Sequence, residues 1–254
     1  MRWSYAEAKK DIKLSDCTFY HVFDIPEHQT GGMRCEWDLR GQADVYLGNF
    51  PFDGKRVLEI GPASGFLTYE MEKRGADVVA LEKASMTFDC VPYPEECLAE
   101  ARKAMDAGDF GANVHNSFWY IHNHYGLKAK VFYGDAYDIP EDLGCFDVAV
   151  IANVLLHCEN PVRILAECAK RAKVLIVVEM HYKHLEGNPV IRLAPTKENM
   201  AFYTWWHFST DFFKGFYRVM GYDDIRLSYH SQKHVGQYPT IVEYPMFTII
   251  GAKA

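Results

Sequence analysis

The hydrophobic positions of this chain predict strands that alternate with helices from about residue 56 onward. Five short apolar runs have the length of strands buried on both faces, and they lie at 57–60, 77–81, 131–133, 146–152 and 174–178. Helical spacing occurs at 66–74, 161–170 and 209–220, and two last apolar runs at 224–229 and 247–251 predict a closing hairpin pair. Strands that alternate with helices indicate an α/β fold, in which helices cover both faces of a parallel sheet.

The ends of the predicted helices carry residues that start or stop helices. Asn160 is a suitable cap for the helix at 161–170, and Pro161 suits its first position. Gly75 and Gly221 follow the other two helices, and glycine is a common residue just past a helix end. These signals agree with the alternation read from the hydrophobic pattern.

Three parts of the chain do not follow this alternation. Residues 1–50 are rich in aromatic side chains and lack a strand–helix rhythm, so we expect an N-terminal cap that packs on the core. Residues 51–254 then form one ligand-binding domain. The long connections 83–128 and 180–208 follow the second and fifth strands, where ligands of such sheets bind. We expect two helices in 83–128 and irregular structure in 180–208, and both connections to serve as lids or substrate walls.

Composition narrows the class of partner. The chain has 254 residues, and 49% of them are hydrophobic, so one domain with a large core is expected. Lys and Arg number 27 against 34 Asp and Glu, which gives a net charge of −7. This acidic balance counts against nucleic acid as the main partner. No run of 18 apolar residues occurs, so no membrane association is expected.

The cysteines point to a reducing compartment. They are seven in number and include no Cys-x-x-Cys pair, so we expect free thiols and a cytoplasmic location. Cys90 and Cys97 would need closer spacing or a nearby pair of histidines to form a zinc site, and no metal is expected. The sequence leaves open whether the protein forms a homodimer.

A candidate binding loop follows the first predicted strand. It leads directly into a helix and reads Glu59-Ile60-Gly61-Pro62-Ala63-Ser64-Gly65. Gly61 permits a tight turn, while Ala63 and Gly65 are small enough for a ligand to approach the backbone. The helix presents unpaired N–H groups to that ligand. The dinucleotide fingerprint would also require glycine at 63 and 66, where this chain has Ala63 and Phe66, so a pyrophosphate ligand is disfavoured.

The pattern acidic-x-Gly-x-small-x-Gly resembles motif I of the class I S-adenosylmethionine (SAM)-dependent methyltransferases. Three more elements carry the same resemblance. Glu82 stands at the end of the second strand, 21 residues after Gly61. Gly134-Asp135-Ala136 follows the third strand, and the run 146–157 resembles the motif IV strand of this family. Together these elements cover about residues 55–180.

The resemblance implies a Rossmann-like, seven-stranded sheet whose last strand is antiparallel, and it implies SAM as the cofactor. Glu82 would accept hydrogen bonds from the ribose hydroxyls, unless it is a solvated acid paired with Lys83. Asp135 would reach the adenine amino group, and Ala136 would contribute a backbone N–H. The implied cofactor-binding residues are Glu59, Gly61, Pro62, Ala63, Ser64, Gly65, Glu82, Asp135, Ala136 and Asn153.

Methyl transfer to a hydroxyl or amine can use a general base, and two histidines are candidates. His181 follows the fifth strand and His207 lies in the presumed lid, and both titrate near neutral pH. Each is equally open to a packing role. His157 recurs at such helix entries, so it has both a structural and a substrate-binding interpretation. The predicted substrate wall consists of Tyr20, His21, Trp119, His157, Tyr203 and Trp206, and its aromatic members are equally compatible with the core.

Some segments also resemble a subset related to the tRNA wobble-uridine methyltransferases that use carboxylated SAM. They are Phe19-Tyr20-His21, Trp37-Asp38-Leu39-Arg40 and Ala201-Phe202-Tyr203. The chain lacks the long basic N-terminal region of those enzymes. We therefore expect a methyltransferase that acts on a small molecule, with a tRNA-modifying enzyme and a non-catalytic SAM- or nucleoside-binding protein as alternatives.

Overall fold

The computed structural model describes residues 3–29, 35–84, 91–99, 110–236 and 241–253. Its strands are Phe19–His21 (β1), Cys35–Asp38 (β2), Arg56–Ile60 (β3), Asp77–Glu82 (β4), Lys130–Tyr133 (β5), Phe146–Ala152 (β6), Ala172–Met180 (β7), Ile191–Leu193 (β8), Trp206–Phe208 (β9), Asp224–His234 (β10) and Val242–Ala252 (β11). Its α-helices are Pro26–Gln29 (α1), Ala43–Tyr46 (α2), Phe66–Lys73 (α3), Phe110–Tyr125 (α5), Pro161–Arg171 (α6) and Thr210–Val219 (α7). Short 3-10 turns are Leu14–Asp16 (η1), Glu141–Leu143 (η2), Leu155–His157 (η3) and Lys183–Leu185 (η4).

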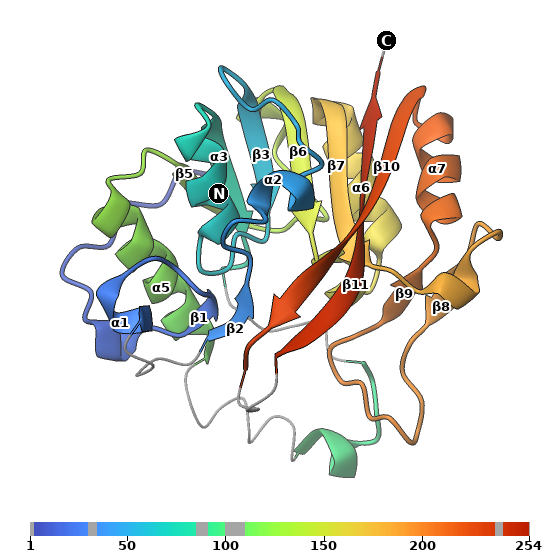
Figure 1. Cartoon of the computed structure of the whole chain (residues 1–254), viewed down its shortest axis with the longest axis horizontal. Coiled ribbons are helices and arrows are strands. Elements are labelled where there is room, and N and C mark those ends of the chain that lie inside the picture. The colour runs from blue at the N-terminus through green and yellow to red at the C-terminus, as the bar shows by residue number, and fades with distance from the viewer. Residues whose placement is uncertain (1–2, 30–34, 85–90, 100–109, 237–240, 254) are drawn as a thin grey trace.

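A large mixed sheet runs through the molecule in the order β1-β2-β10-β11-β7-β6-β3-β4-β5 (Figure 1). Strands β3, β4, β5, β6 and β7 are parallel, and β11 runs antiparallel to both β7 and β10. The seven strands from β10 to β5 are the predicted Rossmann-like sheet. The antiparallel last strand is confirmed.

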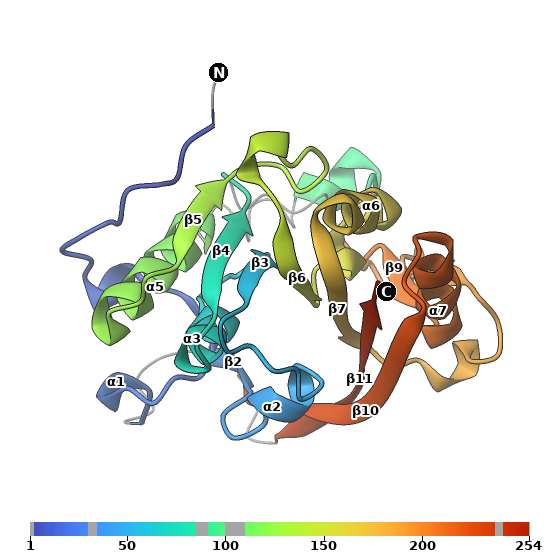
Figure 2. The same cartoon turned by 90° about the horizontal axis from the view of Figure 1, so that it is seen from above.

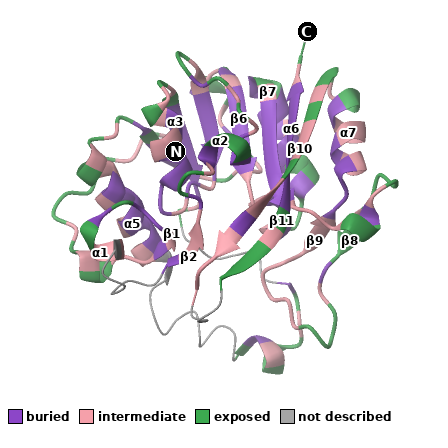
Figure 3. Ribbon diagram, viewed as in Figure 1, coloured by how far each residue is buried: buried purple, intermediate pink, exposed green. Residues whose placement is uncertain are grey.

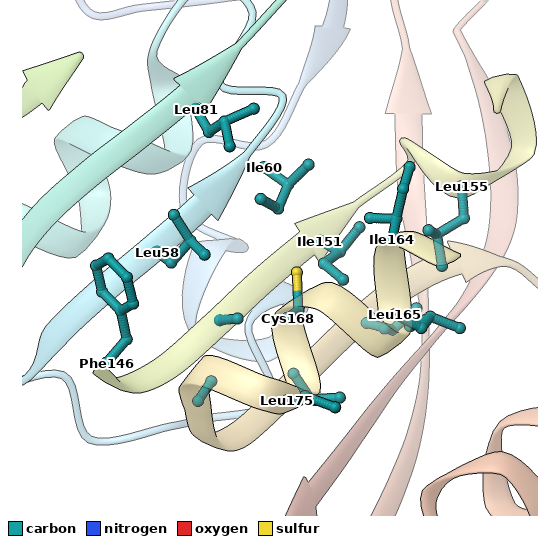
Figure 4. Packing of buried hydrophobic residues seen from close by; sticks show 14 of the residues in the cluster. Leu58, Ile60, Leu81, Phe146, Ile151, Leu155, Ile164, Leu165, Cys168 and Leu175 are labelled. Carbon is teal, nitrogen blue, oxygen red and sulfur yellow. The ribbon is translucent and has the colours of Figure 1, made fainter. Parts of the chain in front are cut away.

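Alternation along the central strands separates two hydrophobic layers. Val57, on β3, packs into one layer with α2, α3 and α5, whereas its neighbour Leu58 packs into the other with α6 and α7. Figure 2 shows these helices on opposite faces of the sheet, and Figure 3 shows the central strands as its most buried part. Figure 4 shows Ile164, Leu165 and Cys168 of α6 directed onto the strands. The prediction of helices on both faces is confirmed.

The predicted helix signals occupy their expected places. The side chain of Asn160 accepts a hydrogen bond from the backbone N–H of Arg163 at 3.2 Å, and Pro161 is the first residue of α6. Ser209 caps α7 in the same way. Gly75 and Gly221 follow α3 and α7 with φ of 87° and 78°, which only glycine adopts without strain.

The first fifty residues extend the sheet, which the sequence did not predict. Strand β1 pairs in parallel with β2, and β2 pairs with the end of β10 through the couples Asp38–Lys233 and Trp37–His234. The closing hairpin is also longer than predicted, because β10 and β11 pair along eleven residues each. Pro245 interrupts the apolar pattern of β11. It lies beyond the last pair between β11 and β7, so its missing N–H removes no hydrogen bond between these two strands.

The two long connections differ in character. In 83–128, residues 95–99 are helical and α5 covers a face of the sheet, so this described part of the predicted lid belongs to the packed core. In 180–208, irregular structure was expected, but β8 and β9 pair there as a separate two-stranded sheet. Within the described ranges, no helix is long and apolar enough to cross a bilayer.

Candidate active site

A cavity of about 460 Å³ lies where the parallel strands end. Small-molecule sites usually measure about 300–1,000 Å³. Its lining comes from the ends of β1, β2, β3, β4, β6, β7, β10 and β11 and from the loop after β5. The sheet therefore brings residues from both ends of the chain to one place, the position at which α/β sheets bind ligands.

The loop after β3 forms one wall of this cavity. Gly61, Pro62 and Ala63 line it, and Gly61 has a φ of 70°. A Cβ atom on Gly61 would lie 2.7 Å from Val154, so this approach of two loops requires glycine. Ser64 and Gly65 do not line the cavity. The buried hydroxyl of Ser64 instead accepts hydrogen bonds from the backbone of β1, and Gly65 starts α3 with a φ of 84°.

Two buried carboxyl groups face the cavity from neighbouring strand ends. Glu59 is 2% exposed, and burial raises its pKa to about 8, although the hydroxyl of Thr68 donates a hydrogen bond to it. Glu82 accepts hydrogen bonds from the backbone N–H groups of Ala63 at 3.1 Å and Lys83 at 2.8 Å. Burial raises the pKa of Glu82 to about 7. The 7% exposure of Glu82 argues against the solvated alternative.

The remaining predicted cofactor residues also line the cavity. Asp135 accepts a hydrogen bond from the backbone N–H of Tyr137 at 2.8 Å, which orders the loop that presents Asp135 and Ala136. Asn153 follows β6 with a φ of 52°. Its side-chain amide donates to the Tyr46 hydroxyl at 3.0 Å and to Gln232 Oε1 at 3.1 Å.

Three residues of the predicted substrate wall reach the cavity. Tyr20 and His21 line it from β1, and burial lowers the pKa of His21 to about 4, so its imidazole is neutral at pH 7. His157 also lines the cavity, and its Nδ1 donates to the backbone carbonyl of Tyr203 at 2.5 Å. That contact favours the structural interpretation of His157.

The other three residues of that wall lie elsewhere. Trp119, on α5, is 2% exposed and packs onto the sheet, and its indole N–H donates to the Tyr133 hydroxyl at 3.0 Å. Trp206 packs against the layer of α6 and α7 and donates to the backbone carbonyl of Cys158 at 2.9 Å. Tyr203 is absent from the lining, which its neighbour Thr204 joins. For Trp119 and Trp206 the core alternative describes the structure better.

The two histidines predicted as bases are not brought to the cavity. His181 packs against the ring of Tyr229 and lies 3.4 Å from Glu186, while Met180, its neighbour at the end of β7, lines the cavity. Adjacent residues of an extended segment face opposite ways, which is why His181 points elsewhere. His207 stacks on Tyr182 with 3.8 Å between ring centroids. The geometry gives no support to a catalytic role for either residue.

Sequence reasoning missed most of the cavity wall opposite the Gly61 loop. That wall comes from the N-terminal extension, β7 and the closing hairpin, and it contains Glu36, Trp37, Tyr46, Met180, Gln232, Tyr244 and Met246. Gln232 and Tyr244 lie beyond the predicted ends of the hairpin strands. An alternating pattern read past those ends would have been the available signal.

No metal site emerges in the part of the chain that the structure describes, where no three His, Cys, Asp or Glu residues form a suitable group. The described cysteines are free thiols. Cys90 lies outside the described residues, so the pair it was considered to form with Cys97 is not described.

Comparisons with known proteins bear on the fold. No protein-family model matches the chain, and no curated protein matches its sequence. Solved structures do match. A presumed RNA methyltransferase from Pyrococcus horikoshii has a TM-score of 0.51 at 13% identity, covering 84% of this chain and 81% of its own. The pyocyanin biosynthetic protein PhzM has a TM-score of 0.50 at 15% identity, covering 84% and 54%.

The fold is that of the class I SAM-dependent methyltransferases. The magnesium protoporphyrin IX methyltransferase of Synechocystis, solved with S-adenosylhomocysteine (SAH), is similar as well, with a TM-score of 0.49 at 13% identity over 84% of this chain and 80% of its own. Identities this low establish the fold alone. None of these structures supports the resemblance to the wobble-uridine subset.

Proposed function

We propose that this protein is a SAM-dependent methyltransferase that acts on a hydroxyl, amine or similar group of a small molecule. The observation that carries the proposal is the convergence of Glu59, the Gly61–Ala63 turn, Glu82 and Asp135 on one cavity of the class I methyltransferase fold. These residues come from separate strand ends. Their convergence gives a nucleoside-sized ligand an acidic and backbone-rich surface.

The residues present fit SAM. Each oxygen of Glu82 accepts one backbone N–H and keeps capacity for a further donor, so the carboxylate can accept both ribose hydroxyls. Asp135 and the backbone of Ala136 offer an acceptor and a donor for an adenine edge. Glu59 suits an amino group, because a buried carboxylate favours a positive partner. When bound, SAM supplies an electrophilic methyl group.

The rest of the cavity holds the acceptor. Tyr20, Trp37 and Tyr244 give this part an aromatic lining that excludes water and fixes the orientation of a small molecule. Positioning of two reactants supplies a large part of the rate enhancement in such displacements. An acceptor side lined in this way, together with a Glu82 that faces the cavity, favours an enzyme over a non-catalytic binding protein.

Calorimetry with SAH and with NAD tests the proposal. We expect SAH to bind at micromolar or tighter concentration and NAD to bind at least tenfold more weakly, because the loop lacks the second and third glycines of the dinucleotide fingerprint. Tight NAD binding without SAH binding would refute the proposal. Thermal melting with each ligand provides an independent readout, since a ligand of the native state raises the melting temperature.

A further inference from the structure

Glu36, on β2, lines the cavity but has no part in the cofactor contacts proposed above. Strands β1 and β2 pair in parallel with Phe19 opposite Cys35, so the next residues, Tyr20 and Glu36, lie side by side. Phe19 and Cys35 point into the hydrophobic layer of α2, α3 and α5. Since successive side chains of a strand point to opposite faces, Tyr20 and Glu36 point away from that layer, and both reach the cavity.

The carboxylate of Glu36 is half-buried, and within the described ranges no hydrogen bond or ion pair holds it. Its backbone is fixed, because the carbonyl of Glu36 accepts a hydrogen bond from the N–H of Val235 at 2.8 Å. The neighbouring acid Asp38 differs, since Arg40 donates to both of its carboxylate oxygens at 2.9 and 2.8 Å. The strand therefore presents Glu36 at the cavity in a fixed place, with its charged group available to a ligand.

The charged residues around the cavity are mostly acids. Four carboxyl groups line it, those of Glu36, Glu59, Glu82 and Asp135, whereas Lys83 is the only Lys or Arg among the described lining residues. Lys83 directly follows Glu82 in the chain, and the proposed cofactor contacts use every one of these acids except Glu36. An acceptor with a carboxylate or phosphate would meet a negative surface, and an acceptor with a positive charge would be attracted to it.

Tyr20 connects the site at Glu36 to the cofactor region. Burial raises the pKa of the Tyr20 hydroxyl well above its usual value, and the negative charges of Glu36 and Glu82 raise it further. The same phenol is thus close to the carboxyl group proposed for the ribose and to the one without a role. An aromatic ring beside a carboxylate suits an ammonium group, because ring faces attract cations.

We propose that the methyl acceptor carries a positively charged ammonium or amidinium group, and that Glu36 binds this group beside Tyr20. The proposal rests on the proposed methyltransferase function and names the substrate class of the same cavity. Glu36 gives the cation a partner that offsets its repulsion from the sulfonium of SAM.

The charged group serves recognition, and the methyl group goes to a different atom of the same molecule. A protonated nitrogen has no lone pair for a displacement, so the nucleophile is an oxygen or a neutral nitrogen elsewhere in the acceptor. That atom forms its bond to the methyl carbon as the S–C bond breaks and the bonding pair stays on sulfur. The proton that the new bond displaces goes to water.

Three probes of similar size and different charge test this proposal. Phenethylamine is a cation at neutral pH, phenethyl alcohol is neutral and phenylacetate is an anion. Calorimetry on the full chain saturated with SAH measures the three dissociation constants. We expect the amine to bind about tenfold more tightly than the alcohol, the lower end of the range for hydrogen bonds to charged groups, because Glu36 is only half-buried. The acid should bind most weakly. An amine that binds no better than the alcohol, or does not bind, overturns the proposal.

Variants of Glu36 assign the preference to its charge. Glu36→Gln keeps the size of the side chain, so amine affinity should fall about tenfold to that of the alcohol, while SAH affinity stays within about threefold. Glu36→Asp retains the charge and should retain the preference. Glu243→Gln removes an exposed charge of β11 outside the cavity and should change neither constant.

Two results with Glu36→Gln would overturn the proposal. One is an unchanged preference for the amine, and the other is a tenfold loss of SAH affinity, which would assign the carboxylate to the cofactor. If Glu36→Gln does not fold, the wild-type preference and its retention in Glu36→Asp decide.

The charge of the methylated product gives an independent readout. Wild-type protein is incubated with methyl-labelled SAM and a deproteinised small-molecule extract of the producing cells, and mass spectrometry separates labelled products from SAM. A product that a cation exchanger retains at neutral pH supports the proposal, and a neutral or anionic product overturns it. Failure to bind SAH, or SAH binding without any labelled product, counts against the methyltransferase function itself.

Discussion

Three buried carboxyl groups with raised pKa values lie in or beside the cavity. Glu59 and Glu82 line it, and Glu179 lies behind it on β7. Burial raises the pKa of Glu59 and Glu179 to about 8 and that of Glu82 to about 7. A positively charged ligand favours their ionised forms, so ligand binding and proton release are coupled in this protein.

Replacement of Glu82 tests its contact with the ribose. In Glu82→Ala both ribose hydroxyls lose their acceptor, and a hydrogen bond to a charged group is worth about 1.5–3 kcal/mol. We expect the SAH dissociation constant to rise about ten- to a hundredfold in calorimetry. Asp77→Ala, an exposed acid on the same strand, is the matched control and should leave it unchanged. An unaltered constant in Glu82→Ala would show that this carboxylate does not bind the ligand.

Proton release on SAM binding follows from the raised pKa values. At pH 7 the ligand-free carboxyl of Glu59 is mostly protonated and that of Glu82 is about half protonated, and the cationic ligand stabilises both anions. Binding should therefore release protons at pH 7, and affinity should rise with pH until it levels off above about 8. Calorimetry in buffers of different ionisation enthalpy counts these protons. Glu59→Gln should release fewer, and equal counts in the variant and wild type would exclude Glu59 as the source.

The residues whose position at the cavity was predictable from sequence are those that depend on local structure. The turn from Gly61 to Ala63 follows a strand and precedes a helix within a few residues, so its place at the strand ends was readable. His181 was assigned from its position just past β7, but one residue of difference reverses the direction of a side chain in an extended segment. Met180 lines the cavity at the position where the prediction placed His181. The direction in which a side chain points at a strand end depends on tertiary contacts that the sequence does not show.

At the scale of elements, Glu179 joins β7 to the turn that follows β6. Its carboxyl accepts a hydrogen bond from the backbone N–H of Leu155 at 3.1 Å, at the start of η3. This contact holds the loop that carries Asn153. The loop position therefore depends on a side chain whose protonation changes near pH 8.

Stability should depend on pH through Glu179. Its pKa is raised from 4.5 to about 8 in the folded protein, so the folded state retains a proton that the unfolded chain has lost. The resulting stabilisation is complete below pH 4.5 and is lost as the pH rises through 8, by at most about 1.4 kcal/mol per pH unit. Glu179→Gln cannot ionise, so it does not lose this stabilisation. The unfolding free energy of the variant minus that of wild type should therefore increase from pH 5 to pH 9. Urea denaturation at both pH values measures this gain, and the exposed Glu198→Gln should show none.

The elements that the sequence did not reveal are short or have distant partners. Strands β1 and β2 contain three and four residues, too few for a periodic pattern, and β2 pairs with β10 near the other end of the chain. The central strands were readable because burial on both faces makes them continuously apolar. The ends of β10 and β11 were missed because they are half-exposed and because Pro245 breaks the pattern. Most of the unpredicted cavity wall comes from these elements.

At the scale of the whole molecule, the net charge of −7 bears on the tRNA alternative. Nucleic-acid binding depends on neutralising phosphates with Lys and Arg, and it weakens steeply with salt. We expect no submicromolar complex with bulk tRNA in a gel-shift assay near 150 mM salt, a typical physiological level. A salt-dependent, submicromolar complex would favour the tRNA-modifying function over methylation of a small molecule. A known tRNA methyltransferase, assayed in parallel, serves as the positive control.

The pairing of the first fifty residues with the closing hairpin also bears on how the protein is made. The carbonyl of Tyr46 accepts a hydrogen bond from the hydroxyl of Thr248, 202 residues later in the chain. Residues 1–50 leave the ribosome before β3 to β7, whereas β10 and β11 emerge after them. Contacts of such high sequence separation form late in folding. A nascent chain that has produced β3 to β7 can collapse around them, but it lacks Gln232, Tyr244 and Met246 and so has no complete pocket. Cofactor can therefore assist the folding of this protein only after synthesis of the hairpin, and truncated translation products should be left without that protection.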